Sequence, residues 1–129
     1  LALVGGGYFL QQPIYVGDLA TVLVEAAGKE STFGRIANVA GPDVVTSKKY
    51  YDIVGNVLGR EVTITEVSVE AFLTENPGSA NFIDHRVYDR SALADMRLPV
   101  PVTPLSDGLA RQVAYLRAES PGPHWEALG

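Results

Sequence analysis

Pro13-Ile14-Tyr15-Val16-Gly17-Asp18-Leu19-Ala20 is the stretch of sequence that most clearly predicts the fold. The apolar, β-prone residues 14–16 predict a short strand. Asp18 then stands where a helix N-cap is expected, because its carboxylate can accept hydrogen bonds from the free N–H groups of the next turn. Apolar residues follow at helical spacing: Leu19, Val22, Leu23, Ala26 and Ala27. The stretch predicts a strand, a cap and a helix with one face in the core.

The residues after this helix predict a second strand and a well-capped second helix. The run from Arg35 to Ala40 indicates a strand, closed by a Gly41-Pro42 turn. Thr46 is placed to cap a helix that ends at Gly59, a residue suited to the left-handed C′ position. Gly55 inside this helix costs about 1 kcal/mol relative to Ala, which indicates that another segment packs closely against it.

The rest of the chain predicts one more strand and three more helices. Residues 61–67 alternate loosely between apolar and polar side chains, as a strand does. Ser68 can cap a short helix, and Asp89 or Ser91 begins another that reaches about residue 96. Thr103 and Pro104 fit the cap and first position of a last helix. The expected fold class is α/β or α+β, with few strands and four or five helices.

The composition allows one globular domain and excludes several functional classes. The chain has 129 residues, 47% of them hydrophobic, and a net charge of −5. A nucleic-acid interface is not expected, because the ten Lys and Arg residues form no basic stripe. No apolar run approaches the ~20 residues of a membrane span. The absence of cysteine is compatible with a reducing cytoplasm, which is the expected location.

The glycines near the N-terminus do not form a dinucleotide-binding loop. Such a loop needs a small residue at position 10 and a helix directly after it, but position 10 is Leu and Pro13 interrupts any helix there. Gly5-Gly6-Gly7 therefore predicts a turn between two extended segments. The chain also begins inside an apolar run rather than at Met, so we expect it to be a piece of a longer protein.

The order of these motifs resembles the C-terminal half of the extended short-chain dehydrogenase/reductases, the NAD-dependent epimerase/dehydratase family. Residues 15–20, Tyr-Val-Gly-Asp-Leu-Ala, are similar to the family motif His/Tyr-Val-x-Asp-Val/Leu-Ala. Residues 36–41, Ile-Ala-Asn-Val-Ala-Gly, are similar to the Tyr-Asn-Val-Gly-Gly strand, and the Thr-capped helix ends in the similar Leu-Gly-Arg of residues 58–60.

The resemblance implies a Rossmann-like parent protein with NAD or NADP as its cofactor. Residues 1–120 would be its C-terminal substrate-binding segment and residues 121–129 a tail. The partners implied are a small-molecule substrate and an N-terminal nucleotide-binding domain that this sequence lacks. The family's catalytic Tyr stands four residues before a Lys, and none of the six Tyr here has a Lys at that spacing. No catalytic and no cofactor-binding residue is expected in this chain.

Three residues are candidates for substrate binding: Gln11, Tyr15 and Arg86. The resemblance places Gln11 where sugar-nucleotide enzymes carry an Arg, and a neutral amide argues against a diphosphate there. Tyr15 holds the His/Tyr position of the motif; its alternative role is that of a core aromatic. Arg86 lies in an irregular stretch that borders the substrate in the family; its alternative role is a surface ion pair.

The sequence leaves one alternative function open and argues against two kinds of site. The sequence is also similar to non-catalytic accessory subunits of respiratory complex I in the same superfamily, so a structural or assembly subunit is the alternative. A metal site is not expected from two distant histidines, and a Ser91–His85 nucleophile pair lacks the Gly-x-Ser-x-Gly elbow.

Without its sheet partner the strand at 35–40 would expose an apolar edge, so a homodimer is expected.

Overall fold

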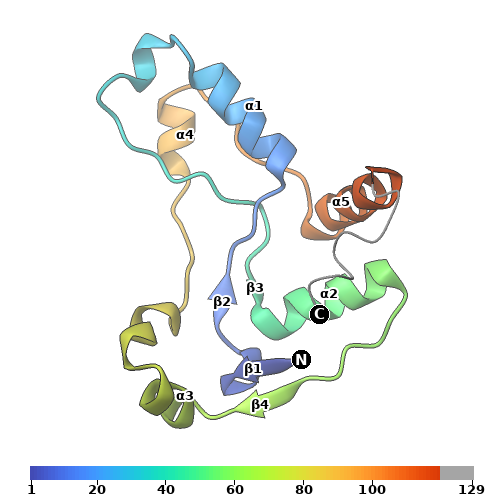
Figure 1. The fold of residues 1–129 in the computed structure, drawn as a ribbon. Helices are drawn as coiled ribbons and strands as arrows, with labels where there is room; N and C mark the ends of the chain where they lie inside the picture. Colours follow the sequence, from blue (N-terminus) through green and yellow to red (C-terminus); the bar gives the residue numbers. More distant parts are fainter. Residues whose placement is uncertain (120–129) are drawn as a thin grey trace.

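The computed structural model describes residues 1–119, which form five α-helices, four short strands and three 3-10 turns (Figure 1). Helices α1 (Val16–Ala26) and α4 (Ser91–Asp95) lie together at one end of the molecule. Strands β1 (Ala2–Val4) and β4 (Thr65–Val67) lie at the other end, beside α3 (Val69–Glu75). The described residues are therefore of mixed α/β class, as the sequence predicts.

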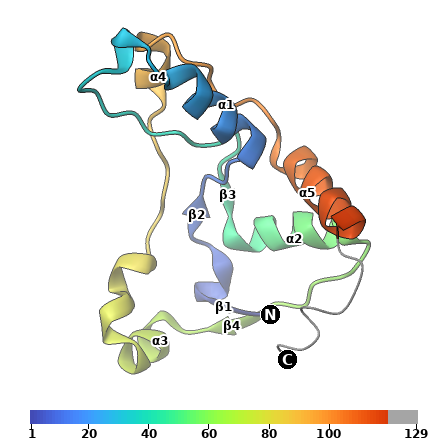
Figure 2. The same cartoon turned by 45° about the horizontal axis from the view of Figure 1, so that its top comes forward.

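Two small sheets organise the N-terminal segment (Figure 2). Strand β1 pairs in parallel with β4, Ala2 opposite Thr65, and β2 (Leu10–Gln11) pairs antiparallel with β3 (Val45–Thr46). The 3-10 turn Gly5–Gly7 joins β1 to β2, and all three glycines have positive φ, which favours glycine. The predicted glycine turn between two extended segments is confirmed.

Helix α1 begins three residues earlier than the sequence predicts, with its N-cap at Tyr15 and not at Asp18. Residues 14–16 form no strand: Tyr15 is the N-cap, without a side-chain hydrogen bond, and Val16 is already helical. Asp18 is therefore inside the first turn, and its prediction as the N-cap is wrong. The predicted apolar face is half correct, because Val22 is buried while Leu23 is 62% exposed.

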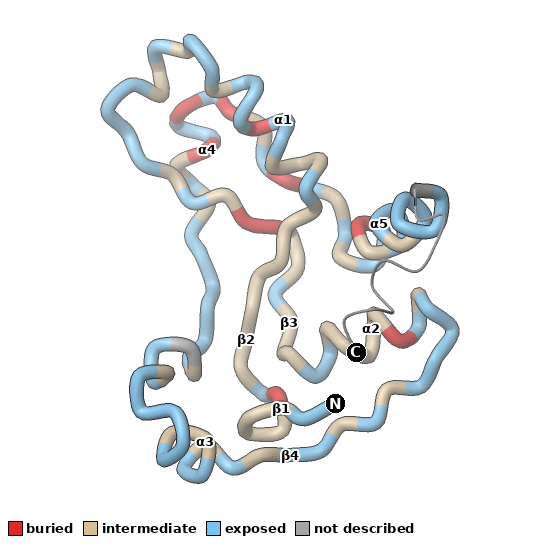
Figure 3. The backbone as a smooth tube through the Cα atoms, in the orientation of Figure 1, coloured by how far each residue is buried: buried red, intermediate tan, exposed pale blue. Residues whose placement is uncertain are grey.

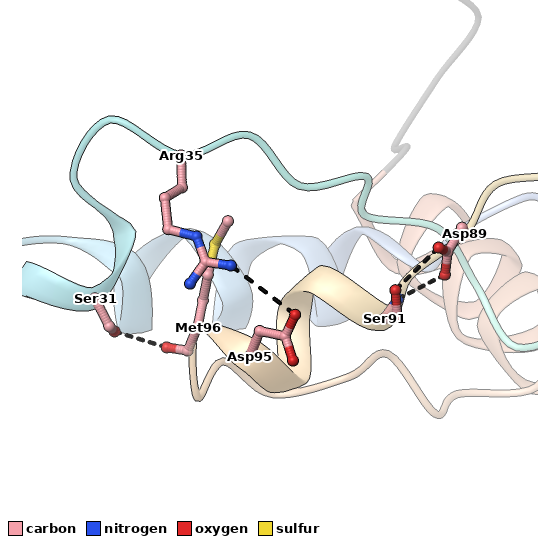
Figure 4. A network of polar contacts seen from close by, with 6 residues as sticks. All are labelled: Ser31, Arg35, Asp89, Ser91, Asp95 and Met96. Atoms are coloured by element: carbon pink, nitrogen blue, oxygen red, sulfur yellow. Dashed lines mark hydrogen bonds and ion pairs between the residues drawn. The ribbon is translucent and has the colours of Figure 1, made fainter.

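The main hydrophobic cluster lies between α1 and α4 and contains Val22, Leu93, Met96 and Leu98 (Figure 3). The turn after α1 is tied to the end of α4 by polar contacts. The Ser31 hydroxyl donates to the Met96 carbonyl at 2.7 Å, and Arg35 lies 3.9 Å from Asp95 (Figure 4). The Ser31 bond satisfies a carbonyl at the C-terminal end of α4, and the Arg35–Asp95 ion pair adds a second link to the same end. Together they hold α4 over the cluster.

Residues 35–40 form no strand in the described part of the chain, so the predicted second strand is wrong. Ala40 is buried, whereas Ile36 is 92% exposed. A strand requires a neighbouring strand to receive its hydrogen bonds, and the described residues provide none here. The Gly-Pro turn that follows is tightly packed: a Cβ on Gly41 would lie 1.9 Å from the Pro13 carbonyl oxygen.

Helix α2 (Ser47–Leu58) is the element whose sequence prediction is most completely confirmed. The Thr46 side chain accepts from the Lys49 N–H, and Gly59 has the left-handed conformation at the C-terminus. Gly55 is buried, and a Cβ there would lie 2.6 Å from the Arg60 carbonyl oxygen, which explains the glycine. Helix α2 packs against the last helix, α5 (Leu105–Glu119).

The remaining predictions are confirmed in part. Ser68 caps α3 by accepting from the Ala71 N–H, and α4 begins at the predicted Ser91. Of the strand predicted at 61–67, only β4 forms. Thr103 does not accept a bond at the start of α5, where the Leu105 N–H donates instead to Asp43 at 2.7 Å. The predicted tail, 121–129, lies outside the described residues.

Candidate ligand-binding site

Two neighbouring hollows lie beside α2, the first next to β2 and the second next to α5, and the three predicted site residues are divided between them. The first hollow, of about 480 Å³, is lined by both Gln11 and Arg86. The second, of about 210 Å³, is lined by Tyr15. Pro13 and Tyr50 line both hollows, so the two are adjacent. The complete lining of the first hollow is Leu3, Gln11, Gln12, Pro13, Ser47, Tyr50, Tyr51, Arg86 and Tyr88.

Backbone contacts with β2 bring Arg86 to the first hollow. The Arg86 N–H donates to the Leu10 carbonyl at 2.8 Å, and the Leu10 N–H donates to His85 Nδ1 at 3.0 Å. His85 also packs against the rings of Tyr8 and Phe9. The irregular stretch around residue 86 thus lies alongside β2, which places the guanidinium of Arg86 near Gln11.

Gln12 is a structural residue of the site that the sequence analysis did not identify. Its Oε1 accepts from the Tyr88 N–H at 2.8 Å, and its Nε2 donates to the Gly41 carbonyl at 2.9 Å. One amide therefore joins the stretch at 83–90 to the turn that follows residue 40. No local pattern marks Gln12, because both partners are remote in sequence.

The first hollow is lined by groups that can bind a polar ligand. Its lining residues include one permanent cation, Arg86, and no Asp, Glu or His. The Arg86 guanidinium donates to the Asn81 carbonyl at 3.0 Å, and its positive charge favours an anionic group such as a carboxylate or phosphate. Three tyrosines, Tyr50, Tyr51 and Tyr88, add aromatic faces and hydroxyl groups.

Tyr15 lines the second hollow and is half-buried against α5. Two glycines make room for its ring: a Cβ on Gly17 would lie 2.5 Å from Tyr15 Cε1, and one on Gly108 would lie 3.1 Å from Tyr15 Cβ. The Arg111 guanidinium lies 5.4 Å from the ring centroid, within cation–π range. Tyr15 therefore has a packing role as well as a position in the hollow.

Asp18 lies beside this second hollow and binds the segment that enters α5. Partial burial raises the pKa of Asp18, but hydrogen bonds from the Thr103 side chain and backbone, from the Val102 N–H, and the Arg111 charge lower it further than burial raises it. The pKa of Asp18 is thus below its ordinary value, and the carboxylate is ionised near neutral pH. Its role in the structure is to hold a loop in place.

The other chemical candidates are engaged elsewhere. The Ser91 hydroxyl donates to Asp89 at 2.9 Å and His85 Nδ1 accepts from the backbone, so the two do not form a nucleophile–base pair (Figure 4). Within residues 1–119, no group of three His, Cys, Asp or Glu side chains is arranged to hold a metal ion. None of the helices in this range combines the length and the apolar character that crossing a bilayer requires.

No protein-family model matches the sequence, and no curated protein is significantly similar to it. The function is therefore argued from the two hollows and their lining residues.

Proposed function

We propose that this chain supplies the substrate-binding segment of an NAD(P)-dependent oxidoreductase, epimerase or dehydratase. The single observation that supports the proposal is the shared hollow of Gln11 and Arg86. Both were selected from the sequence as substrate-side residues, and they belong to segments far apart in the chain. The volume of about 480 Å³ lies within the range of pockets for small molecules.

In this proposal the chain binds and orients the substrate, and the chemistry comes from outside the chain. A nucleotide-binding domain preceding Leu1 would hold NAD or NADP and supply the Tyr-Lys pair. The lining of the first hollow offers the binding groups that this division requires, a guanidinium, side-chain amides and tyrosine hydroxyls. Arg86 would hold an anionic group of the substrate, and Gln11 and the tyrosines would bond its hydroxyl or carbonyl groups.

Two titrations test the proposal. In the first, ¹⁵N-labelled chain is titrated with small hydroxy acids and sugar phosphates while the amide signals of Gln11 and Tyr51 are followed. Arg86→Gln and Gln11→Ala should each weaken binding about tenfold, the loss expected for a charge-assisted or a well-placed neutral hydrogen bond. Arg117→Gln, which removes an exposed Arg from the end of α5, is the matched control and should leave binding unchanged.

The second titration uses NADH and NADPH with the isolated chain in a calorimeter. We expect no appreciable binding, because the Gly5-Gly6-Gly7 turn leads into strand β2 and not into a helix whose N-terminus could hold a diphosphate. Micromolar affinity for either nucleotide would contradict the assignment of this chain to the substrate side.

A second candidate function is a non-catalytic structural or assembly subunit of the same superfamily. It is favoured by the exposed apolar side chains of α1 and the segment that follows, among them Val24 (73% exposed), Phe33 (65%) and Ile36 (92%). Exposed apolar groups in one region are typical of protein–protein interfaces. The sequence upstream of Leu1 separates the two functions: an intact Tyr-x-x-x-Lys favours the enzyme, and its loss favours the subunit.

A further inference from the structure

The two hollows differ in polarity although they adjoin. The second is lined mainly by apolar groups and has no Asp, Glu, Lys, Arg or His among its lining residues. Its lining consists of Pro13, Ile14, Tyr15, Val16, Tyr50, Thr103, Leu105, Gly108, Leu109 and Gln112. The first hollow, in contrast, is lined by Arg86 and has no negative charge in its lining. One hollow therefore suits an anion, and the other suits an uncharged, largely apolar group.

Tyr50 and Pro13 connect the two hollows because they line both. Tyr50 packs edge-on against Tyr51, with 5.3 Å between the ring centroids, so its ring has a defined position on helix α2. A ligand that lies over Tyr50 and Pro13 would therefore reach both hollows. Nothing in either lining requires a second charged group on the ligand.

The polar groups of the first hollow divide into those that hold the fold and those that are left for a ligand. Both amide atoms of Gln12 are used in hydrogen bonds within the protein. Across residues 1–119, by contrast, the amide of Gln11 and the hydroxyl of Tyr50 form no hydrogen bond within the protein. Both residues line the first hollow and Tyr50 also lines the second, so these two groups can bond the polar head group of a ligand.

We propose that the two hollows together bind one amphipathic ligand, an organic carboxylate with a short hydrocarbon or aromatic end. This inference rests on the proposed function, in which the first hollow is a ligand site. The positive charge of the Arg86 guanidinium attracts the carboxylate in the first hollow. The apolar end enters the second hollow against Leu105 and Leu109, where removal of its surface from water favours binding. The small volume, about 210 Å³, limits the apolar end to a short chain or a single ring.

Three probes of graded chemistry test this inference on the full 129-residue chain. Hexanoate carries both ends of the proposed ligand, acetate carries the carboxylate alone, and 1-hexanol carries the hydrocarbon without the charge. In ¹⁵N-detected titrations, hexanoate should shift the amide signals of Tyr51 in the first hollow and Gly108 in the second. Its dissociation constant should be about tenfold lower than that of acetate or hexanol, because only hexanoate uses both contacts.

Two variants assign the ends of the ligand. Arg86→Gln should lower the affinity for hexanoate about tenfold and leave the affinity for hexanol unchanged, since only the carboxylate is attracted by the charge of Arg86. Leu109→Phe fills part of the second hollow. It should lower the affinity for hexanoate and leave the affinity for acetate unchanged. The amide spectrum of each variant reports whether it folds. The comparison of the three probes on the unaltered chain does not depend on the variants.

The outcomes separate this inference from the proposed function. Shifts of Tyr51 without shifts of Gly108, with hexanoate no tighter than acetate, would overturn the amphipathic ligand and leave the first hollow as a substrate site. Simultaneous, independent binding of acetate and hexanol with no gain for hexanoate would also overturn it. If neither these probes nor the hydroxy acids and sugar phosphates bind at the first hollow, both the inference and the proposed function fail.

Discussion

Asp18 and Thr103, which are 85 positions apart in the sequence, are joined by two hydrogen bonds. One Asp18 carboxylate oxygen accepts from the Thr103 backbone N–H at 2.8 Å, and the other accepts from the Thr103 hydroxyl at 2.7 Å. The Val102 N–H adds a third bond at 3.0 Å. This contact fixes the start of α1 against the segment that enters α5. Because Tyr15 and Gly108 lie on the same two elements, it also sets the shape of the second hollow.

Asp18→Ala should destabilise the fold by about 1–2 kcal/mol, since three hydrogen bonds to a carboxylate are lost from a partly exposed site. Asp18→Asn should cost less, because the amide oxygen can still accept from the backbone N–H groups and the Thr103 hydroxyl can accept from the amide. Urea denaturation measures both variants. Equal losses for Ala and Asn would mean that the negative charge, rather than the geometry of its bonds, is the main contribution.

Stability should fall in acid through Asp18 and Asp89. The pKa of Asp18 is below its ordinary value of 3.8 for the reasons given above, and hydrogen bonds from the Ser91 N–H and hydroxyl lower the pKa of Asp89. A carboxyl whose folded pKa is below its unfolded pKa stabilises the fold fully above the unfolded value and loses that effect as the pH falls through the folded value. We expect the urea midpoint to decline between about pH 5 and pH 2. The decline should be shallower for Asp18→Asn, and an unchanged acid limb in that variant would contradict the assignment.

Gly41→Ala should be among the most destabilising single substitutions in the chain. A Cβ there would lie 1.9 Å from the carbonyl oxygen of Pro13, which lines both hollows, so the backbone of one of the two segments must move. Overpacking against backbone of this kind costs about 3 kcal/mol. Gly78→Ala is the control, because a Cβ at Gly78 meets nothing within 4 Å. Thermal denaturation of the pair checks the prediction, which fails if the two variants melt together.

Leu93→Ala should destabilise the fold by about 3 kcal/mol, because it empties a site at the centre of the α1–α4 cluster. Leu93 is 0% exposed, whereas Leu116 on α5 is 53% exposed. The same substitution at Leu116 should therefore change the free energy of unfolding by about 0.5 kcal/mol or less. A comparable loss at both positions in urea denaturation would show that the α1–α4 cluster is not the stabilising core.

The chain should self-associate through the segment at 35–40, most simply as a two-fold homodimer. The backbone of residues 36–39 forms no hydrogen bond within residues 1–119, and Ile36 is 92% exposed. Two copies could satisfy these edges by pairing with one another. Sedimentation velocity at low micromolar concentration should show a dimer that Ile36→Lys dissociates and the control Leu116→Lys does not. A monomer that binds no hydrophobic dye would mean that this edge needs no partner.

The features that the sequence predicted well are those whose physics is local. Thr46 and Ser68 each cap a helix by accepting from an N–H three residues later, and Gly59 needs only its own left-handed backbone. The close packing at Gly55 could be predicted because a glycine inside a helix lowers its stability, and close contact with another segment is a reason to keep it there. The glycine turn after β1 follows from the same conformational freedom. None of these requires knowledge of a distant residue.

The positions of Asp18, Gln12 and Ile36 were decided only by the tertiary structure. The sequence could place Asp18 near a helix start, but its hydrogen-bonding partners, Val102 and Thr103, lie in a loop more than 80 residues later in the chain. Gln12 likewise joins two segments that are remote in the sequence. Residues 35–40 have the composition of a strand, but within residues 1–119 no other strand pairs with them. A carboxylate accepts from whichever donors lie within reach, and a strand exists only when another pairs with it. Local sequence fixes neither of these conditions, because both depend on which distant segments the fold brings together.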